Sequence, residues 1–495
     1  MVFPIIGGDG KPTGYNIDNS LRFDGDNDRL THTRGTATNE KKFTFSTWVK
    51  LGLTGFSANG TLFGSGDDGN GYTGDMLAIQ TNGLIKQGDH DSSTDAHNVR
   101  TNAVLRDQSA WYHIVAACDS TQGTDSNRIK LYINGTQQTS LAASTYPSQN
   151  ITFDCNTSGQ VLNIGRNQNG ENHTYFEGYM AETVFIDGQQ LAPSSFAETD
   201  DNGVWIPKDI STQGLTFGNN GFYLQYQQSG DSANSSGKGA DTSGEDNHLA
   251  PVSMGSVLPV VDTPTNNFAV FRPHGFPKDS RSVITNGNTD FDFTGDGSVG
   301  GRRLSAHVVS NIGVTQGKWY AEFKLTEDAN GGFVGVSNLS NKIHTGDIDS
   351  YNYLNTDAGN KYVREKTGES ESNAAHGGAV SVNDIVQVAL DADNRNVYFG
   401  KGGSWASGSG AWNQATPTSA VSYTADFVTT DSHGVVVFNA AGAGSSETPR
   451  WLANFGNPVF TISSGNSDAN GYGLFEYAVP SGYYALCTKN LAEYG

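Results

Sequence analysis

Apolar and polar residues alternate with a period of two along several short stretches of this chain. The clearest are residues 43–49 (FTFSTWV) and 111–117 (WYHIVAA) in the N-terminal half and 319–325 (WYAEFKL) in the C-terminal half. A period of two places one face of a strand on a core and the other in polar surroundings, so these stretches predict the strands of a β-sandwich. Residues 127–133 are followed by Asn134-Gly135, a pair that accepts the two positive φ angles of a type I′ turn and therefore predicts a hairpin.

The patterned stretches fall into two blocks, residues 21–226 and 265–495, with a segment rich in Ser, Gly, Asp and Asn at 227–264 between them. That segment offers little apolar surface to pack, which indicates a linker. Residues 1–20 are punctuated by Gly and Pro, and we interpret them as an attachment arm. A single all-β domain extends to roughly 200–250 residues. A chain of 495 residues with 62 glycines therefore predicts an all-β protein of two tandem sandwiches joined by a Ser/Gly-rich linker.

Charge and composition narrow the range of partners. The formal net charge is −21, which repels both a phosphate backbone and an anionic membrane surface, so nucleic acid is not an expected partner. No apolar run approaches the ~18 residues of a membrane span, and the first residues lack the features of an export signal. We therefore expect no membrane insertion, and folding in a cytoplasm with release by lysis. The three cysteines build no disulfide framework, although a Cys118–Cys155 bridge is left open.

Ordered motifs link each block to a known family. Residues 21–25 (LRFDG), 45–49, 111–113 and 131–135 (LYING) make residues 21–225 resemble the laminin-G-like or concanavalin-like lectin/glucanase family. Residues 317–322 (GKWYAE), 388–391 and 397–399 make residues 265–490 similar to a SPRY-type domain. In the second block, residues 400–403 (GKGG) replace the usual Lys-Asn-Gly turn. The resemblances imply two tandem concanavalin-like jelly-roll sandwiches.

Taken together, short segments along nearly the whole chain resemble virion proteins of marine bacteriophages, including cyanophages; they are residues 3–8, 17–21, 205–207, 262–267 and 485–487. This resemblance implies a tail-fibre or capsid-fibre (decoration) component on the particle surface. Its expected partners are a host-surface glycan, other virion proteins bound through the N-terminal arm, and further copies of the chain, in a trimer as in many fibres. Two alternatives stay open: a polysaccharide-degrading, glucanase-like enzyme, and a purely structural capsid or tail cement protein.

Catalysis is not expected from these residues. Glucanases on this fold present Glu-x-Asp-x-x-Glu on one strand, so that two carboxylates flank the glycosidic bond. The single Glu-x-Asp of this chain is Glu198-Thr199-Asp200, and Gly203 stands where the second Glu would be. Motifs for nucleophilic, zinc or nucleotide chemistry are also missing from the sequence.

Two groups of residues are candidates for ligand binding. Asp24, Asp26 and Asp28 gather oxygen donors at one turn, which suits Ca²⁺, although the spacing fits no fixed calcium loop and favours an ordinary acidic hairpin loop. Glycan binding needs an aromatic face beside polar side chains that bond to hydroxyls. The residues that supply this chemistry are Asp68, Asn70, Tyr72 and Trp412, which have turn and core roles as their alternatives.

Overall fold

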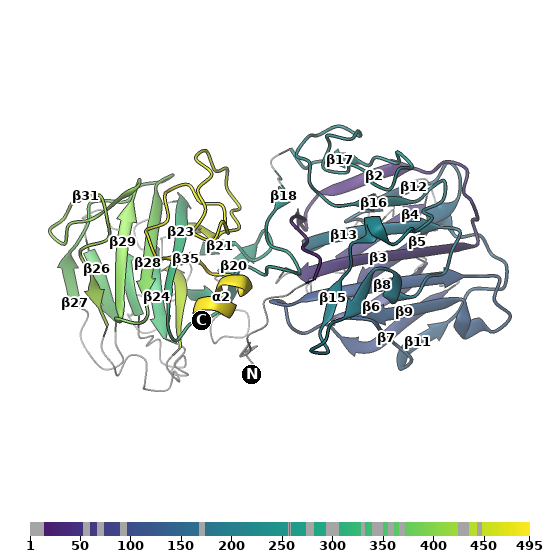
Figure 1. Ribbon diagram of the computed structural model, residues 1–495, viewed down its shortest axis with the longest axis horizontal. Coiled ribbons are helices and arrows are strands. Elements are labelled where there is room, and N and C mark those ends of the chain that lie inside the picture. Colours follow the sequence, from purple (N-terminus) through teal and green to yellow (C-terminus); the bar gives the residue numbers. More distant parts are fainter. Residues whose placement is uncertain are drawn as a thin grey trace. The chain divides into compact units, whose positions relative to one another are not determined.

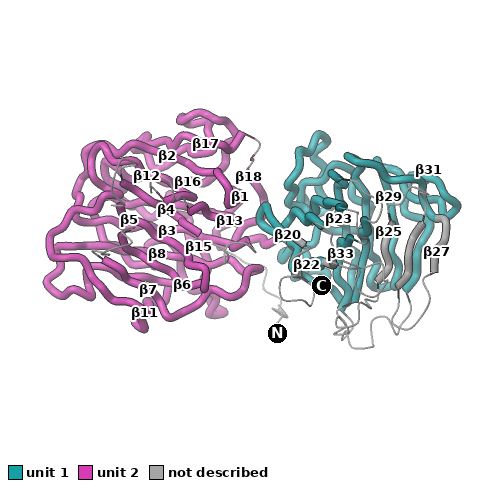
Figure 2. The backbone as a smooth tube through the Cα atoms, turned by 180° about the vertical axis from the view of Figure 1, so that it is seen from behind, with its two compact units in different colours: residues 1–11, 268–495 teal, residues 12–267 magenta. Residues whose placement is uncertain are grey.

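The chain divides into two compact units, residues 12–267 and residues 268–495, which we call the N-terminal and the C-terminal sandwich (Figure 2). Both are all-β, as predicted. The computed structural model describes residues 14–52, 60–66, 74–89, 97–167, 174–255, 257, 259–273, 282–293, 306–327, 332–338, 350–354, 361–365, 372–423, 435–442 and 448–495.

Two eight-stranded sheets form the N-terminal sandwich (Figure 1). The first has the order β10-β9-β8-β3-β13-β1-β18, with β16 beside β13, and the second the order β11-β7-β6-β5-β4-β12-β2-β17. The strands of the first sheet are β1 (Ser20–Asp24), β3 (Lys42–Leu51), β8 (Trp111–Asp119), β9 (Ile129–Ile133), β10 (Thr136–Gln137), β13 (Glu177–Asp187), β16 (Phe222–Leu224) and β18 (Pro259–Val260). Those of the second are β2 (Arg29–Thr33), β4 (Gly60–Gly66), β5 (Asp75–Ile79), β6 (Leu84–Asp89), β7 (Asn98–Val104), β11 (Leu141–Thr145), β12 (Val161–Ile164) and β17 (Ala250–Val252).

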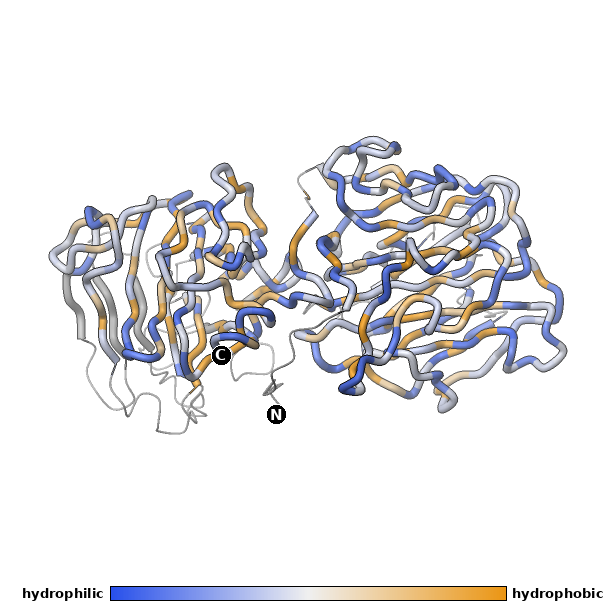
Figure 3. The backbone as a smooth tube through the Cα atoms, viewed as in Figure 1, coloured by the Kyte–Doolittle hydropathy of each residue, from blue (hydrophilic) through white to orange (hydrophobic). Residues whose placement is uncertain are grey.

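The predicted alternation produces the core between these sheets. Phe43 and Phe45 of β3 point inward and meet Phe63 of β4, with the rings of Phe43 and Phe63 edge to face at 6.0 Å. Orange and blue segments alternate along the strands in Figure 3, as a two-faced strand requires. Asn134 and Gly135 have φ angles of 45° and 77°, which confirms the hairpin between β9 and β10.

The outer face of the first sheet is covered as well. His113 of β8 is 1% exposed and lies between Trp48 and Trp205, the latter from the hairpin β14 (Ala197–Thr199) and β15 (Trp205–Pro207). Its ring nitrogens bond to Ser46 Oγ at 2.8 Å and to Trp205 Nε1–H at 3.0 Å. His113 is thus a hydrogen-bonded residue of the sheet.

The predicted linker is wrong, because residues 227–264 fold onto the N-terminal sandwich. Strand β17 extends the second sheet beside β2, and β18 extends the first beside β1. The Asp241 carboxylate accepts backbone N–H bonds from Tyr223, Ser243 and Asn247 and so fixes the polar loop. Lys50 Nζ, which is fully buried, pairs with Asp262 at 2.7 Å. Side-chain bonds to the backbone replace the apolar contacts that the composition lacks.

The described end of the predicted N-terminal arm is also part of this sandwich, while residues 1–13 lie outside the described part. Ile17 is 4% exposed and its backbone N–H donates to Thr265 Oγ1 at 3.0 Å. Cys118 and Cys155 are buried free thiols, so the bridge left open by the sequence is not formed. Short 3₁₀ turns are η2 (Asp125–Asn127), η3 (Asp154–Asn156), η4 (Pro193–Ser195) and η5 (Ile210–Thr212).

The C-terminal sandwich packs a seven-stranded sheet on a ten-stranded one. Phe271 of the first sheet stacks on Phe323 of the second at 6.2 Å, and both rings meet Phe455. The first sheet has, in spatial order, β19 (Phe271–Pro273), β22 (Ala306–Ser310), β33 (Val436–Gly442), β24 (Gly332–Asn338), β25 (Ser350–Leu354), β26 (Lys361–Glu365) and β27 (Ser372–Ala375). The second has β20 (Ser282–Thr285), β21 (Asp290–Phe293), β34 (Arg450–Asn454), β23 (Lys318–Glu327), β28 (Ile385–Asp391), β29 (Asn396–Lys401), β30 (Ser404–Ala406) and β31 (Trp412–Gln414), with β32 (Val421–Ser422) beside β29 and β35 (Tyr484–Ala485) beside β23.

One helix, α2 (Thr488–Tyr494), follows the last strand in the described C-terminal region. Residues 400–403, which replace the usual Lys-Asn-Gly turn, belong to a hairpin in which β29 pairs with β30. Within the described residues, no helix has the length and apolar character needed to span a bilayer.

Candidate functional site

Three polar residues share the inner face of the second sheet of the N-terminal sandwich, where β5, β6 and β7 lie side by side. Asp75 opens β5, Asp89 closes β6, and His97 directly precedes β7. Asp75 and Asp89 are register partners, and the Asp89 N–H donates to the His97 carbonyl at 3.0 Å. Because side chains alternate along a strand, Asp75 faces the same way as the core residues Leu77 and Ile79. The fold therefore turns all three polar groups toward the interior.

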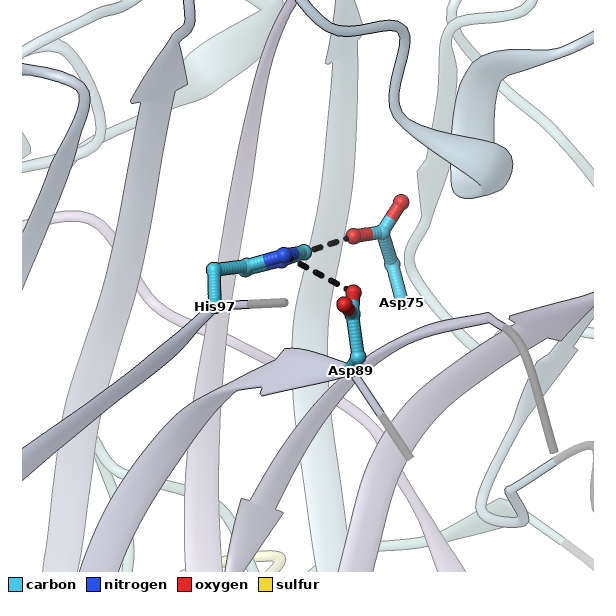
Figure 4. A group of neighbouring side chains, drawn as sticks. All are labelled: Asp75, Asp89 and His97. Atoms are coloured by element: carbon cyan, nitrogen blue, oxygen red, sulfur yellow. Dashed lines mark ion pairs between the residues drawn. The ribbon is translucent and has the colours of Figure 1, made fainter. Parts of the chain in front are cut away.

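The imidazole of His97 stands between the two carboxylates (Figure 4). His97 Nε2 lies 3.1 Å from Asp75 Oδ1, and His97 Nδ1 lies 2.8 Å from Asp89 Oδ1. The side chains of His97 and Asp75 are each 2% exposed, and that of Asp89 is 19% exposed. The turn η3 lies over the group, since the Cys155 N–H donates to Asp75 Oδ2 at 3.1 Å and the Phe153 ring meets His97 edge-on. We call Asp75, Asp89 and His97 the acid–histidine cluster.

Charge dominates this cluster. Burial alone lowers the pKa of His97, but the hydrogen bonds and negative charges of Asp75 and Asp89 outweigh it and raise the pKa to about 9. Burial and the same two carboxylates raise the pKa of the half-buried Asp154 to about 6, while His97 opposes that rise. Asp154, which lies in η3, is thus a fourth titratable group in the electrostatic environment of the cluster.

The three side chains of the cluster are close enough together to hold one metal ion, since one donor atom from each lies within 4.8 Å of the other two. Among the described residues, the cluster is the group of acidic, histidine or cysteine side chains that meets this condition. An imidazole that ligates a metal through Nε2 commonly donates its Nδ1–H to a carboxylate, which is the position of Asp89. His97 Nε2 and Asp75 would then be the ligands. Imidazole nitrogen suits Zn²⁺ and similar transition metals, whereas Ca²⁺ prefers oxygen donors alone.

We expect Zn²⁺, and not Ca²⁺, to raise the thermal midpoint of the N-terminal sandwich. A metal that binds only the folded state at 100 times its Kd adds about 2.7 kcal/mol. Scanning calorimetry of the full chain with each metal and with a chelator measures the change, with His97→Gln as the variant that should lose it. An equal midpoint in all conditions would show that the cluster is a self-contained ion pair.

The predicted calcium ligands are arranged differently from a metal site. The Asp24 carboxylate accepts backbone N–H bonds from Asp26 and Asn27, at 2.8 and 3.3 Å, and so closes its own turn. Asp28 is 1% exposed, and burial together with the charge of Asp24 raises its pKa to about 7. The segment is an acidic turn closed by its own side chain, as the alternative supposed, but it is not a hairpin, because it connects β1 of the first sheet to β2 of the second. Ca²⁺ binding there stays a prediction.

The predicted glycan-binding residues are only partly described, since Asp68, Asn70 and Tyr72 lie outside the described residues. Trp412 is half-buried, and its ring rests on Gly377 and Gly378, where an added Cβ would come within 2.4 Å and 2.9 Å of it. Glu198 and Asp200 flank the end of β14. Glu198 is 52% exposed and pairs with Lys208, while the Asp200 carboxylate accepts the Val204 N–H at 2.8 Å. These two carboxylates serve a surface hairpin.

Another buried carboxyl, that of Glu182, lies on the first sheet of the same sandwich. Glu182 is 3% exposed and has a φ of 49°, at a register shift between β13 and β3. The Tyr223 hydroxyl donates to it, and Tyr15 lies close by. Burial raises the pKa of Glu182 to about 8, the Tyr223 bond opposes the rise, and the negative charges of Asp209 and Asp18 add to it. Glu182 is therefore strained, because a non-glycine residue has a left-handed backbone conformation and also carries a buried carboxyl group.

Sequence reasoning missed both Glu182 and the acid–histidine cluster. The three cluster residues are separated by 14 and 8 positions and follow no metal-binding spacing. One pattern in the sequence could have indicated the cluster. Asp75 stands two and four positions before Leu77 and Ile79, so a strand places all three on one face, which predicts an inward-facing acid on an apolar strand.

Part of the chain is similar to a known family. Residues 24–192 match the family model of the concanavalin A-like lectin/glucanases superfamily. No curated protein matches the chain. Similar solved structures include domains LG4-5 of the mouse laminin α1 chain, with 10% identity over 96% of this chain and 88% of that one at a TM-score of 0.31.

Two further structures are similar over about a third of the chain. The SAP-like pentraxin of Limulus polyphemus, a heptamer, is 14% identical over 36% of this chain and 80% of that one, at a TM-score of 0.27. The SPRY domain of human HERC1 is 16% identical over 35% of this chain and 91% of that one, at a TM-score of 0.24. The family match covers residues 24–192, which lie in the N-terminal sandwich, and the laminin G-like, concanavalin-like fold of that sandwich agrees with it.

Proposed function

We propose that this protein binds carbohydrate, and that it does so on the surface of a bacteriophage particle, where it recognises host-surface glycans. The observation that carries the binding role is the match of residues 24–192 to the concanavalin A-like lectin/glucanases superfamily. The placement on a virion rests on the whole-chain sequence resemblance described above. In this proposal the N-terminal residues attach the protein to other virion components.

Trp412 is the one residue among the four glycan-binding candidates of the sequence that is described, and it lies in the C-terminal sandwich, outside the matched residues 24–192. Its ring lies against Gly377 and Gly378 at the start of β31. The neighbouring Asn413 is exposed and Gln414 is half-buried, and both carry amides that can bond to hydroxyls. An aromatic face beside amides is the combination that recognises a pyranose ring.

A glycan array probed with the full chain tests the proposal, with host envelope polysaccharide as a second probe. We expect binding to a subset of glycans, and Trp412→Ala to weaken it at least ~10-fold, or about 1.4 kcal/mol. Trp412→Phe, which keeps an aromatic face, should retain part of the affinity. Binding that is unaffected by either variant would place the glycan site elsewhere. Failure to bind any glycan or host cell would favour the alternative of a purely structural capsid or tail cement protein.

The enzymatic alternative has its own measurement. Purified protein is incubated with host polysaccharide and the release of reducing sugar is followed over time. We expect none, and mass spectrometry of purified particles should find the chain in the virion. Sugar release that Glu198→Gln or Asp200→Asn abolishes would establish the glucanase-like function instead.

A further inference from the structure

A fully buried lysine lies in the middle of the first sheet of the N-terminal sandwich. Lys50 of β3 has Trp111 of β8 and Tyr179 of β13 as its register partners, and its side chain is 0% exposed. Lys50 Nζ stands 5.7 Å from the centre of the Tyr179 ring. An ammonium group is strongly hydrated in water, so its burial is costly. The groups around this nitrogen therefore determine what Lys50 can do.

Two side-chain oxygens from the segment 262–267 contact the Lys50 nitrogen. Asp262 Oδ2 lies 2.7 Å from Lys50 Nζ, and the Asp262 side chain is also 0% exposed. Asn267 Oδ1 accepts a second hydrogen bond from Lys50 Nζ, again at 2.7 Å. The fold thus brings an amine, a carboxyl and a primary carboxamide to one point, although Lys50 and Asn267 are 217 positions apart in the sequence.

The carboxyl and the carboxamide are both held in place by further hydrogen bonds. Trp111 Nε1–H donates to Asp262 Oδ1 at 3.2 Å. Asn267 Nδ2–H donates to the Ser109 carbonyl at 2.7 Å. A lysine nitrogen only donates and a backbone carbonyl only accepts, so these two neighbours fix which way the carboxamide is turned. Its carbonyl group faces Lys50 Nζ.

Burial favours the uncharged form of Lys50. It lowers the pKa of Lys50, although the charge and hydrogen bond of Asp262 and the charge of Asp107 oppose the fall. Transfer of one proton from Lys50 Nζ to Asp262 turns the ion pair into an amine and a carboxylic acid, which leaves no buried charge on either group. The nitrogen of an uncharged lysine has a lone pair and is a nucleophile.

We propose that Lys50 and Asn267 form an isopeptide bond in the folded protein, with Asp262 as the proton carrier. Asp262 takes one proton from the Lys50 ammonium group, and the lone pair of Nζ then forms a bond to Asn267 Cγ. The bond between Cγ and Nδ2 breaks, and its electron pair goes to Nδ2. Nδ2 receives the proton that Nζ releases on bond formation and the proton held by Asp262, and it leaves as an ammonium ion. Nothing is oxidised or reduced, and no co-reactant is needed.

The positions of the reacting groups compensate for the low reactivity of an amide. The carbon that is attacked is bonded to Oδ1 at about 1.2 Å, so it is the next atom beyond the contact with Nζ. Groups held in position react as if at effective concentrations of up to about 10⁵–10⁸ M. The reaction also occurs once in each chain, so a slow rate is sufficient.

The bond gives the N-terminal sandwich a covalent closure. It joins strand β3, in the middle of the first sheet, to Asn267, the last residue of this compact unit. The chain is thereby anchored at the point where it leaves the sandwich. Formation of the bond does not depend on carbohydrate binding.

Intact-mass spectrometry of the purified full chain tests the proposal. We expect a mass that is lower than the mass of the sequence by that of one ammonia molecule. Tandem mass spectrometry of a protease digest should find a branched peptide in which Lys50 is linked to Asn267. This peptide distinguishes the bond from loss of ammonia by ring closure at another asparagine. Both measurements use the wild type and need no variant to fold.

Variants assign the role of each group. Asn267→Ala and Lys50→Arg each remove a reacting group and should abolish the loss of ammonia. Asp262→Ala removes the proton carrier and should raise the fraction of unlinked chain at least ~10-fold. Lys42→Arg is the matched control, because Lys42 lies on the same strand and pairs with Asp119 at 3.2 Å, and it should keep the loss of ammonia. Unfolding midpoints check that each variant is folded.

Three outcomes would overturn the proposal. A folded wild-type chain with the full mass of its sequence contains no such bond. A chain that has lost ammonia but yields no peptide linking Lys50 to Asn267 is modified at another asparagine. A folded Asp262→Ala variant that is linked as completely as the wild type does not use Asp262 as its proton carrier.

Discussion

Glu182→Gln is expected to weaken the pH dependence of the stability of the N-terminal sandwich between about pH 5 and pH 8, and the raised pKa values of Asp28 and Asp154 account for the part that remains. Burial raises the pKa of Glu182 to about 8 in the folded protein, against 4.5 for an ordinary glutamate. As the pH rises above 4.5, the unfolded chain releases this proton and the folded chain keeps it, so unfolding becomes easier. The contribution is complete below pH 4.5 and is lost as the pH rises through 8.

The size of this effect follows from proton linkage. Each unit of pKa difference corresponds to about 1.4 kcal/mol, so the wild type should lose roughly 4 kcal/mol over this range relative to the variant. Glutamine keeps an acceptor for the Tyr223 hydroxyl and carries no titratable proton. Urea unfolding of both proteins at a series of pH values, followed by tryptophan fluorescence, measures the difference.

Glu198→Gln provides the matched control. Glu198 is 52% exposed and pairs with Lys208 at 3.5 Å, so its replacement should leave the wild-type pH profile unchanged. If Glu182→Gln and the wild type lose stability in parallel as the pH rises, the Glu182 carboxyl is already ionised in the folded state. The left-handed backbone conformation of Glu182 in β13 would then have to be explained by packing alone.

The fold was predictable where alternation and turn chemistry determine it. Phe43 and Phe45 face the core as the period of two requires, and the Asn134-Gly135 turn has the predicted conformation. Residues 227–264 were misread because hydropathy does not register backbone hydrogen bonds. Asp241 supplies three such bonds, and the isolated apolar residue Leu249 is fully buried by the loop that they fix.

The candidate site was less predictable, because tertiary pairing creates it. The sequence draws attention to the acidic run at Asp24–Asp28, whose first carboxylate closes its own turn. Asp75, Asp89 and His97 become neighbours only when β5, β6 and β7 pair in register. Register depends on which residues of three separate strands face the core, and no local spacing encodes it.

His97→Leu is expected to destabilise the N-terminal sandwich more than any surface substitution. The variant leaves the carboxylates of Asp75 and Asp89 facing each other without the imidazole, with the Asp75 side chain only 2% exposed. Removing one partner of a buried charged group costs about 3–5 kcal/mol, because the remaining charge stays buried and uncompensated. Urea unfolding at neutral pH in the presence of a chelator measures the loss without any contribution from metal.

Two further variants separate charge from packing in this cluster. Lys208→Ala removes the half-buried partner of the exposed Glu198 in the same sandwich and should cost less than about 1 kcal/mol. Asp75→Asn combined with Asp89→Asn and His97→Leu removes all three charges, and it should recover much of the stability that His97→Leu loses. If the triple variant is less stable than His97→Leu alone, the carboxylates stabilise the fold through bonds such as that from Cys155 N–H to Asp75, rather than through their pairing with the imidazole.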